Sequence, residues 1–457
     1  MPSWLLYTVG VLVFAFGLLF SIALHEVGHM VPAKRFGVKV TQYMVGFGPT
    51  VFSRKKGDTE YGVKAIPLGG YIRMIGMVPP RADGKVSRWP RRMATAVEEF
   101  RQTSRAEVEP GDEPRQFYRL TPGKKMIVML GGPTMNLIIY LVLTVVVLTA
   151  LGKPHDDATT TVGTVIKCVV PANATDEQKR ETSCTTPNSP AIIAGLLPGD
   201  KLVAINGVKL TSWDDATSTI ENSIGKTLQF TVLRDGAQKT LAITPVRNVK
   251  YVAGSSTQTH EAGFIGVSPT DHHYYKPVGV TAIPGEIGTQ IRTGWDHLMQ
   301  YPARIGDLFG TVFEGKKRGL NSAIGVVGIG RLSGDFARSD LLNAEDKLYT
   351  LIELLASVNL LLFFFNLLPL LPLDGGHVAG ALVESVKRGR ARLALRRNPH
   401  PVGPDGVPID GDKARRQIFV DTAQMLPVMY ALGSLIIVLT LLTLYADIVD
   451  PVNPFSS

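Results

Sequence analysis

The sequence predicts a polytopic α-helical membrane protein with four transmembrane helices, a cytoplasmic or membrane-entering β-hairpin element and an extracytoplasmic β-rich α+β domain. Three observations predict this fold. Hydrophobic residues make up 45% of the 457 residues and charged residues only 19%, which is too apolar for one ordinary soluble domain. Four segments each approach or exceed the ~20 residues that a membrane-crossing helix needs. Basic residues are concentrated in two of the connecting segments.

The four predicted transmembrane segments are residues 1–36, 125–151, 350–380 and 425–446. A secretory signal peptide is the alternative for the first segment. That segment lacks basic residues at its start and has no clear small-x-small cleavage site before Lys34. We therefore expect it to remain in the membrane as the first helix.

The charge distribution predicts the orientation of these helices. Residues 31–125 carry 19 Lys and Arg against 9 Asp and Glu, residues 374–424 carry 9 against 6, and residues 152–350 carry 20 of each. Basic loops stay in the cytoplasm, so we expect a multi-pass protein of a bacterial plasma (inner) membrane whose N- and C-termini are extracytoplasmic. The net charge of +9 is then mainly a topology signal of a protein embedded in membrane lipid, and we expect no nucleic-acid partner.

The two basic segments differ in composition. Residues 37–75 mix β-branched and aromatic residues with Gly and Pro, which predicts short hairpin strands associated with the membrane. Residues 76–124 are expected to be a cytoplasmic linker. Within it, residues 79–119 are polar, basic and interrupted by prolines, which predicts poor order. Residues 381–424 are expected to form a second cytoplasmic loop.

The segment on the outside contains a compact domain over residues 162–246. Its stretch SPAIIAGLLPGDKLVAINGVKL, from Ser189 to Leu210, resembles a PDZ domain of the kind associated with bacterial proteases. Such domains bind extended peptides or chain ends by strand addition; a β-rich domain that only caps the membrane part is the alternative. Residues 247–349 should be an amphipathic helical region, because Ile287, Ile291, Trp295 and Leu298 recur at helical spacing.

The two cysteines of the chain, Cys168 and Cys184, both fall in the segment assigned to the outside. That compartment permits disulfides, so we predict that they form one. Two unpaired thiols in a loop are the alternative.

The first predicted span ends with a polar motif, HEVGH, formed by His25, Glu26 and His29. On a helix, positions i and i+4 lie on one face, so both imidazoles can reach a single metal ion, usually zinc. Glu26 projects from the neighbouring side, where it can deprotonate a water molecule instead of binding the metal. The pattern arises by chance in about 1% of such chains, but ionisable residues in a span cost at least ~2.5–3.5 kcal/mol and are usually functional. We therefore predict a metal site.

Catalytic zinc usually has three protein ligands, and the third is predicted in the stretch NLLPLLPLDGGH. Asp374 follows two prolines and precedes two glycines, which must end or unwind the helix. The first and third spans both run inward, so Asp374 and His29 fall on the same, cytoplasmic, side of the membrane. His377 is the competing ligand, because imidazole is generally the better zinc ligand.

These features together resemble the site-2 protease family of intramembrane zinc metalloproteases, and most closely its bacterial regulator-of-sigma (RseP-like) group with one PDZ domain. Besides HEVGH, the PDZ pattern and NLLPLLPLDGG, the resemblance rests on GFGP at 46–49, LGGYIRM at 68–74 and GGPTMN at 131–136. One departure is that Pro369 and Pro372 are three residues apart, whereas many relatives have them two apart.

The resemblance implies site residues: Zn²⁺ bound by His25, His29 and Asp374, Glu26 as the catalytic base, and Asn136 and Asn366 placing the substrate backbone. Hydrogen bonding between helices is the alternative for the two asparagines. The resemblance also implies a zinc-dependent intramembrane endopeptidase. It would cut transmembrane segments of pre-trimmed single-span proteins, such as anti-sigma factors and remnant signal peptides, in regulated intramembrane proteolysis during a stress response.

The resemblance and the physics of the membrane suggest roles for two further parts. The hairpin 37–75 would pair with the unwound substrate, and the domain 162–246 would act as a size filter. A non-catalytic PDZ membrane adaptor that senses exported peptides is the alternative from another class, and it predicts a damaged metal set. A zinc protease with Glu353 or Glu384 as third ligand is a second alternative. It is disfavoured because Glu353 is expected near the opposite membrane face and Glu384 lies beyond the helix break.

Overall fold

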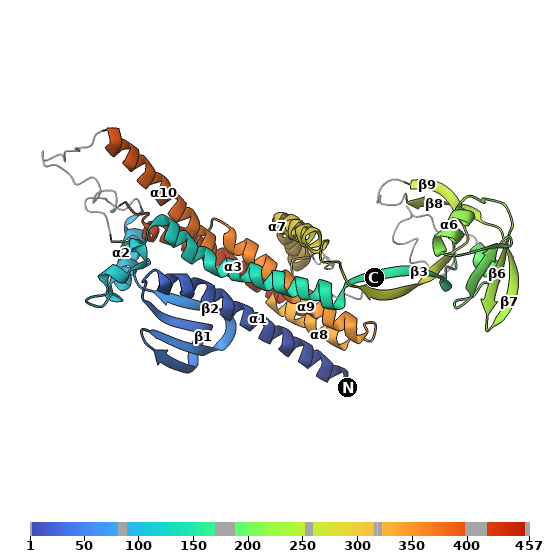
Figure 1. The fold of residues 1–457 in the computed structure, drawn as a ribbon, viewed down its shortest axis with the longest axis horizontal. Helices are drawn as coiled ribbons and strands as arrows, with labels where there is room; N and C mark the ends of the chain where they lie inside the picture. Colours follow the sequence, from blue (N-terminus) through green and yellow to red (C-terminus); the bar gives the residue numbers. More distant parts are fainter. Residues whose placement is uncertain are drawn as a thin grey trace. The chain divides into compact units, whose positions relative to one another are not determined.

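The computed structural model describes residues 2–80, 89–169, 188–251, 259–314, 318, 322–397 and 418–452. These residues form two compact units, which are described separately (Figure 1). Unit 1 combines Met1–Leu151 with Val278–Ser457, and unit 2 is the inserted segment Gly152–Pro277. The predicted metal residues all belong to unit 1.

Four helices of unit 1 are long and apolar enough to cross a membrane, among the residues described, in agreement with the four predicted segments. They are α1 (Ser3–Arg35), α3 (Pro122–Val146, extended by η3, Val147–Leu151), α9 (Ala344–Leu367) and α12 (Leu426–Val449, preceded by η4, Thr422–Met425).

The predicted third span, 350–380, consists of two helices, with a break where the prolines and glycines predict one. Helix α9 ends at Leu367, and a separate helix, α10, begins at Asp374 and runs to Arg397. Pro369 and Pro372 lie between them, and proline cannot continue a helix because it lacks a backbone N–H. Residues 381–397 of the expected cytoplasmic loop are thus helical.

Helices α1 and α3 touch backbone to backbone. A Cβ atom added at Gly28 would lie 2.3 Å from the carbonyl oxygen of Gly131, and one added at Gly131 would lie 2.0 Å from that of Gly28. Small residues permit such close approach between membrane helices. This contact fixes the spacing of the two helices beside the HEVGH motif.

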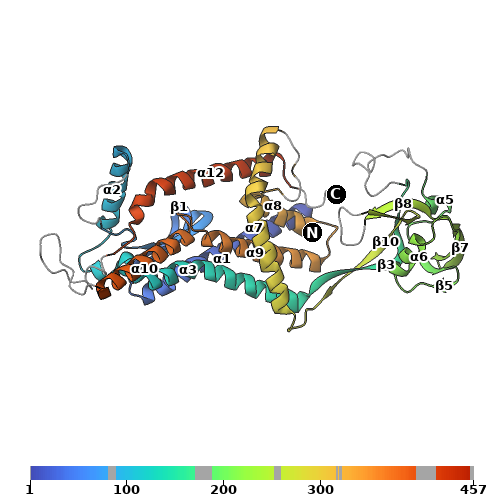
Figure 2. The same cartoon turned by 90° about the horizontal axis from the view of Figure 1, so that it is seen from above.

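Two further helices cover the bundle. Helix α7 (Ile283–Glu314) runs across α9 in Figure 2, and its Leu298 packs into an apolar cluster with Tyr140 of α3 and Phe364 of α9. Helix α8 (Val326–Arg338) packs against the first half of α1, where a Cβ atom at Gly10 would lie 2.7 Å from the carbonyl oxygen of Ser333.

The predicted hairpin element is a bent antiparallel sheet of two long strands, β1 (Val40–Lys56) and β2 (Thr59–Met74). The first part of β1 pairs on one side with residues 70–74 and on the other with residues 60–63, while the last part of β1 pairs with the start of β2. Each strand therefore contributes two segments to the sheet. The bend in β1 lies at Gly46, whose φ of +93° is a conformation that favours glycine.

The sheet leaves large apolar side chains exposed on unit 1: Phe47, Val51, Phe52, Val63 and Ile66. Exposed apolar side chains this close together are typical of surfaces that contact membranes or proteins. Entry of this element into the membrane stays a prediction.

The expectation that residues 79–119 are poorly ordered is wrong for the part of them that the structure describes. Helix α2 (Arg91–Ala106) buries Arg101, whose guanidinium donates to Asp421 and to the carbonyl oxygen of Pro79. Two short helical turns follow, η1 (Glu113–Arg115) and η2 (Phe117–Arg119).

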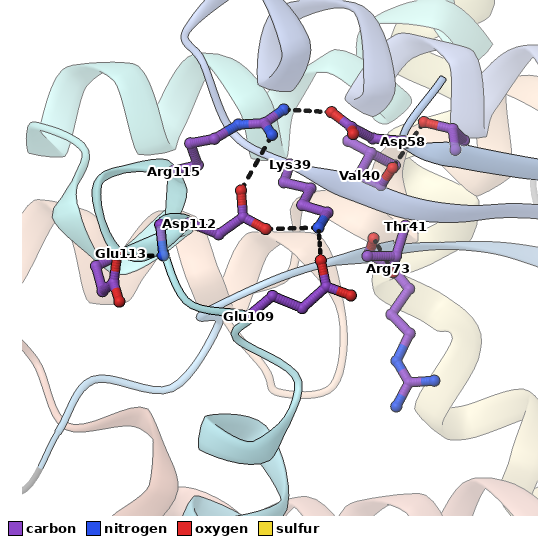
Figure 3. Close-up of polar contacts among 11 residues, drawn as sticks. Lys39, Val40, Thr41, Asp58, Arg73, Glu109, Asp112, Glu113 and Arg115 are labelled. Carbon is purple, nitrogen blue, oxygen red and sulfur yellow. Dashed lines mark hydrogen bonds and ion pairs between the residues drawn. The ribbon is translucent and has the colours of Figure 1, made fainter. Parts of the chain in front are cut away.

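Ion pairs join this segment to the sheet (Figure 3). Lys39, the residue before β1, donates to Asp112 and to Glu109, and Arg115 pairs with Asp58 at the turn between β1 and β2. The ammonium group of Lys39 holds the pKa of the Asp112 carboxyl below its usual range. The order of the segment thus comes from partners elsewhere in the chain.

Unit 2 is a β-rich α+β domain. Its main sheet has the order β10-β3-β4-β6-β7, with β5 paired to β4, and β8 and β9 form a separate antiparallel pair. The elements are β3 (Lys153–Val165), α5 (Pro190–Ile193), β4 (Lys201–Ile205), β5 (Val208–Lys209), α6 (Trp213–Glu221), β6 (Leu228–Arg234), β7 (Ala237–Ile243), β8 (Val246–Tyr251), β9 (Thr259–Phe264) and β10 (Val267–Lys276).

Unit 2 extends beyond the predicted range 162–246 at both ends, because Lys153 of β3 pairs with Lys276 of β10. The expected helical region 247–349 is therefore wrong at its start, where the chain forms strands, and helix begins only with α7 at Ile283. Cys184 lies outside the described residues, so its pairing with Cys168 stays a prediction.

Candidate metal centre

Two elements of unit 1 bring three potential metal ligands together. His25 and His29 lie on α1, and Asp374 is the first residue of α10. Their ligand atoms all lie within 4.8 Å of one another. Oδ2 of Asp374 is 3.4 Å from Nε2 of His25 and 3.3 Å from Nε2 of His29, and the two Nε2 atoms are 3.1 Å apart. The structure thus brings the three residues together, and their binding of a metal ion stays a prediction.

The local sequence explains how Asp374 reaches the histidines. Between α9 and α10 the chain forms a tight local turn, and two glycines follow the aspartate. A Cβ atom at Gly375 would lie 2.3 Å from the carbonyl oxygen of Leu368, and one at Gly376 would lie 2.6 Å from the amide nitrogen of Leu371. Larger residues would therefore force the turn apart.

His29 is oriented by helix α3. Its Nδ1 atom lies 2.8 Å from the carbonyl oxygen of Val128. A carbonyl only accepts hydrogen bonds, so Nδ1 must carry the proton and donate. The lone pair of the neutral ring is then on Nε2, which faces Asp374, as in metal-binding histidines whose other nitrogen donates to a backbone carbonyl.

The space beside the two Nε2 atoms is kept open by Gly132 of α3. A Cβ atom at this position would lie 2.2 Å from Nε2 of His29 and 2.6 Å from Nε2 of His25. Two imidazole nitrogens and one carboxylate oxygen are also a donor set of catalytic zinc sites. The residues present therefore fit a zinc ion.

Glu26 lies next to this group without belonging to it. The residue is 9% exposed, and its carboxylate lies near the backbone amide of Ile72 in β2. Gly70 lies against it as well, because a Cβ atom there would be 3.1 Å from Cγ of Glu26. The end of β2 therefore holds the carboxylate beside the histidines.

The two asparagines lie on the helices that flank the centre. Asn136 is 1% exposed on α3, one turn beyond Gly132, and its Oδ1 atom has no hydrogen-bond partner among the described residues. Asn366 is half-buried in the last turn of α9.

The competing ligands are elsewhere. His377 lies one turn into α10 and is not part of the group of donor atoms within 4.8 Å. Glu384 is buried and pairs with Lys125 and Arg388, and Glu353 lies three turns before Asn366 on α9.

Four residues of the centre carry no individual signal in the sequence: Gly132, Val128, Ile72 and Gly70. Gly132 lies in the GGPTMN stretch, and Gly70 and Ile72 lie in LGGYIRM, so the sequence marks them only through the resemblance of these two motifs. Val128 acts through its backbone carbonyl, so the residue type at this position does not indicate the contact.

The family model "Peptidase family M50" matches residues 13–397. A protein named zinc metalloprotease Rip1 from Mycobacterium tuberculosis is 31% identical, with 99% of this chain and 100% of that protein covered. Rip1 of Mycolicibacterium smegmatis is 29% identical over the same shares. Zinc metalloprotease RasP of Geobacillus kaustophilus is 27% identical, with 79% of this chain and 86% of that protein covered.

Proposed function

Because the chain belongs to peptidase family M50 and is an intramembrane zinc protease, we propose that His25, His29 and Asp374 hold its zinc ion and that Glu26 is its catalytic base. The observation that carries this assignment is the convergence of three donor atoms on the space kept open by Gly132. The non-catalytic adaptor predicted a damaged metal set, and it is wrong, since the chain is a protease.

The mechanism assigns each residue of the centre a task. When bound, zinc supplies a Lewis acid that polarises the scissile carbonyl and acidifies a water molecule. Glu26 accepts the proton of the attacking water and passes it to the leaving amine. Gly70 of β2 lies against Glu26 and limits where its carboxylate can go, and the Val128 carbonyl holds the His29 ring so that Nε2 faces the other donors.

A substrate in the membrane must be unwound before it can be cut, because a helix hides its carbonyls in internal hydrogen bonds. We place the unwound segment beside residues 70–74 of β2, which end next to Glu26, so that it pairs as an added strand. The Oδ1 atom of Asn136 is an acceptor for a substrate N–H, and Asn366 holds the backbone from the α9 side.

The substrates are membrane proteins, and we assign them more closely as pre-trimmed single-span proteins such as anti-sigma factors and remnant signal peptides. Unit 2 is proposed to be a PDZ domain outside the membrane that excludes untrimmed proteins. Its β-rich architecture and the SPAIIAGLLPGD stretch support this. The basic segments 31–125 and 374–424 support a cytoplasmic position for the metal centre of this membrane protein, with both termini outside.

Three purified full-length proteins test the assignment: wild type, Glu26→Gln and Asp374→Asn. We expect wild type and Glu26→Gln to retain about one zinc per chain. Asp374→Asn should lose most of its zinc, and both variants should lose cleavage of a single-span model substrate. Cleavage by Glu26→Gln, or full zinc content in Asp374→Asn, contradicts the assigned roles.

A further inference from the structure

Three charged side chains are buried together outside the metal centre. Nζ of Lys125, on α3, is 2.7 Å from Oε2 of Glu384 on α10, and Oε1 of Glu384 is 2.7 Å from Nη2 of Arg388. The side chains of Lys125, Glu384 and Arg388 are 8%, 3% and 17% exposed. Buried charges lose their hydration, and their attraction restores that loss only when the geometry is good, so such a cluster is weak evidence for stability alone.

Neighbouring residues also contact the two cations of the cluster. Both cations face the ring of Phe419, with Nζ of Lys125 5.5 Å and Cζ of Arg388 5.6 Å from the ring centroid. Nε of Arg388 also donates to the carbonyl oxygen of Ile418. The positions of all three charges are therefore determined by several contacts each.

Lys125 shares one face of α3 with two residues that touch the metal centre. Val128 and Gly132 follow it by three and seven residues, and such positions lie along one side of a helix. Val128 accepts from His29, and Gly132 lies against His25 and His29. The same face of α3 thus contacts the histidines through Val128 and Gly132 and contacts α10 through Lys125, one turn earlier.

Helix α10 needs such an anchor because Asp374 is its first residue. Residues 368–373 connect it to α9 without forming a helix, so α9 does not extend rigidly to the aspartate. The direction and depth of α10 then determine where the carboxylate of Asp374 lies. Glu384 is ten residues further along the same helix, about 15 Å away at the α-helical rise.

We propose that the Lys125–Glu384 pair, supported by Arg388, positions helix α10 so that Asp374 stays at ligand distance from His25 and His29. The pair closes a ring of contacts that runs from His29 through Val128 and α3 to Lys125, then through Glu384 and α10 to Asp374. Lys125 and Glu384 are positioning residues, not ligands. The inference rests on the proposed function, because it takes Asp374 as a zinc ligand.

The test is a double-mutant cycle on zinc affinity, measured on the full-length protein in detergent by competition with a chelator of known affinity. The variants are Lys125→Met, Glu384→Gln and the double variant. Each single variant should bind zinc about 10- to 100-fold more weakly, the usual effect of removing an outer-shell contact. The double variant should bind no more weakly than the weaker single one, since both act through one pair.

A matched control is the buried Arg318–Asp447 pair, whose charged atoms are 3.0 Å apart and whose side chains are 0% and 1% exposed. Asp447 accepts from the backbone N–H groups of Gly325 and Gly328 at the start of α8, away from α3 and α10. Asp447→Asn removes a comparable buried charge and should leave zinc affinity unchanged. An equal loss in this control would mean that any destabilising change weakens zinc binding, and the proposal would fail.

Two further measurements keep the test decisive. Lys125→Met leaves the Glu384–Arg388 pair intact, so it serves if Glu384→Gln does not fold. The visible absorption spectrum of the Co²⁺-loaded protein reports ligand geometry directly, and it should change in Lys125→Met but not in Asp447→Asn. Wild-type affinity and spectrum in a folded Lys125→Met variant, or additive losses in the double variant, would overturn the proposal.

The outcomes separate this proposal from the assignment beneath it. If Asp374→Asn retains zinc, the ligand assignment fails, whatever the cycle shows. If Asp374→Asn loses zinc while the Lys125 and Glu384 variants bind it as wild type does, only the positioning role fails.

Discussion

Nε2 of His29 lies directly beside Gly132, where a methyl group added to the glycine would be 2.2 Å from the nitrogen. The glycine is part of α3, which also supplies the carbonyl of Val128 to the other nitrogen of the same ring. One helix thus orients the imidazole and keeps the space in front of it open.

Gly132→Ala should therefore weaken zinc binding strongly while leaving the protein folded. The added methyl group competes with the metal for the space beside His25 and His29, and we expect zinc affinity to fall at least about 100-fold, the upper end of outer-shell effects. Gly123→Ala, on the same helix, is the control, because no atom of the described residues lies within 4 Å of the position that its added methyl group would take. Zinc content by mass spectrometry of the native protein checks this, and normal zinc content in Gly132→Ala would contradict it.

Gly70→Val should lower kcat without removing zinc. Gly70 lies against Glu26, and a Cβ atom there would be 3.1 Å from Cγ of that residue. A branched side chain must displace the carboxylate, and misplacing a catalytic group by about 1 Å can lower the rate about 100-fold. Cleavage kinetics and zinc content of the same preparation test this. Unchanged kcat would show that the sheet does not hold Glu26 in its working position.

Asn136→Leu should weaken substrate binding but not the fold. Since Oδ1 of Asn136 has no hydrogen-bond partner among the described residues, an apolar residue of similar size removes no such bond there. We expect KM to rise about 10-fold, as for loss of one substrate hydrogen bond, with thermal stability unchanged or higher.

Asn359→Leu is the matched control for this experiment. Nδ2 of Asn359 donates to Oγ of Ser21 at 3.1 Å, linking α9 to α1. Its replacement should lower the free energy of unfolding by about 0.5–1.5 kcal/mol. If Asn136→Leu destabilises the protein as much as Asn359→Leu does, Asn136 has a structural role instead.

The start of helix α6 should lose protection as the pH falls below 4. The hydroxyl of Thr211 and the backbone N–H groups of Thr211 and Ser212 lower the pKa of Asp215 to about 2. A carboxyl whose folded pKa is depressed stabilises the fold above its unfolded pKa of about 3.9, and the contribution is lost as the pH falls through the folded value. The loss should therefore span roughly pH 4 to pH 2.

Amide hydrogen exchange of residues 211–221, corrected for the intrinsic rate, measures this in the full chain. At pH 5 Asp215→Asn should exchange faster than wild type, and the difference should shrink toward pH 2. Asp214→Asn is the control, because Asp214 is not part of the capping box formed by Ser212 and Asp215. A difference between wild type and Asp215→Asn that is independent of pH would contradict the prediction.

The metal centre is largely predictable because its determinants are local or topological. The i, i+4 spacing of His25 and His29 is a property of the helix itself, and the predicted even number of membrane crossings between them and Asp374 predicts that all three lie on the same side. The role of Gly132 is not predictable, since it depends on how closely α3 approaches α1. Pro369 and Pro372 predict the break between α9 and α10. That the chain is helical again after Asp374 depends on distant partners such as Lys125, which a local pattern does not report.

The other errors have the same cause. Residues 91–106 are polar and basic, but Arg101 finds its partner in Asp421, 320 residues later, and the helix packs there. Residues 267–276 fall in the range where a helical region is expected, but they form a strand because β3, more than 100 residues earlier, pairs with them. Periodicity within a short window does not report such pairing.

The contact between Gly28 and Gly131 sets a limit on how the enzyme can vary. Main-chain atoms meet there without any intervening side chain. Any larger residue at either position must therefore push α1 and α3 apart, and no substitution changes their spacing only slightly. Genetic screens should recover null alleles at these two positions and no temperature-sensitive ones. Alleles with partial loss of function should come instead from side-chain contacts between helices, such as Ser21–Asn359, where one hydrogen bond can be removed while the helices remain in contact.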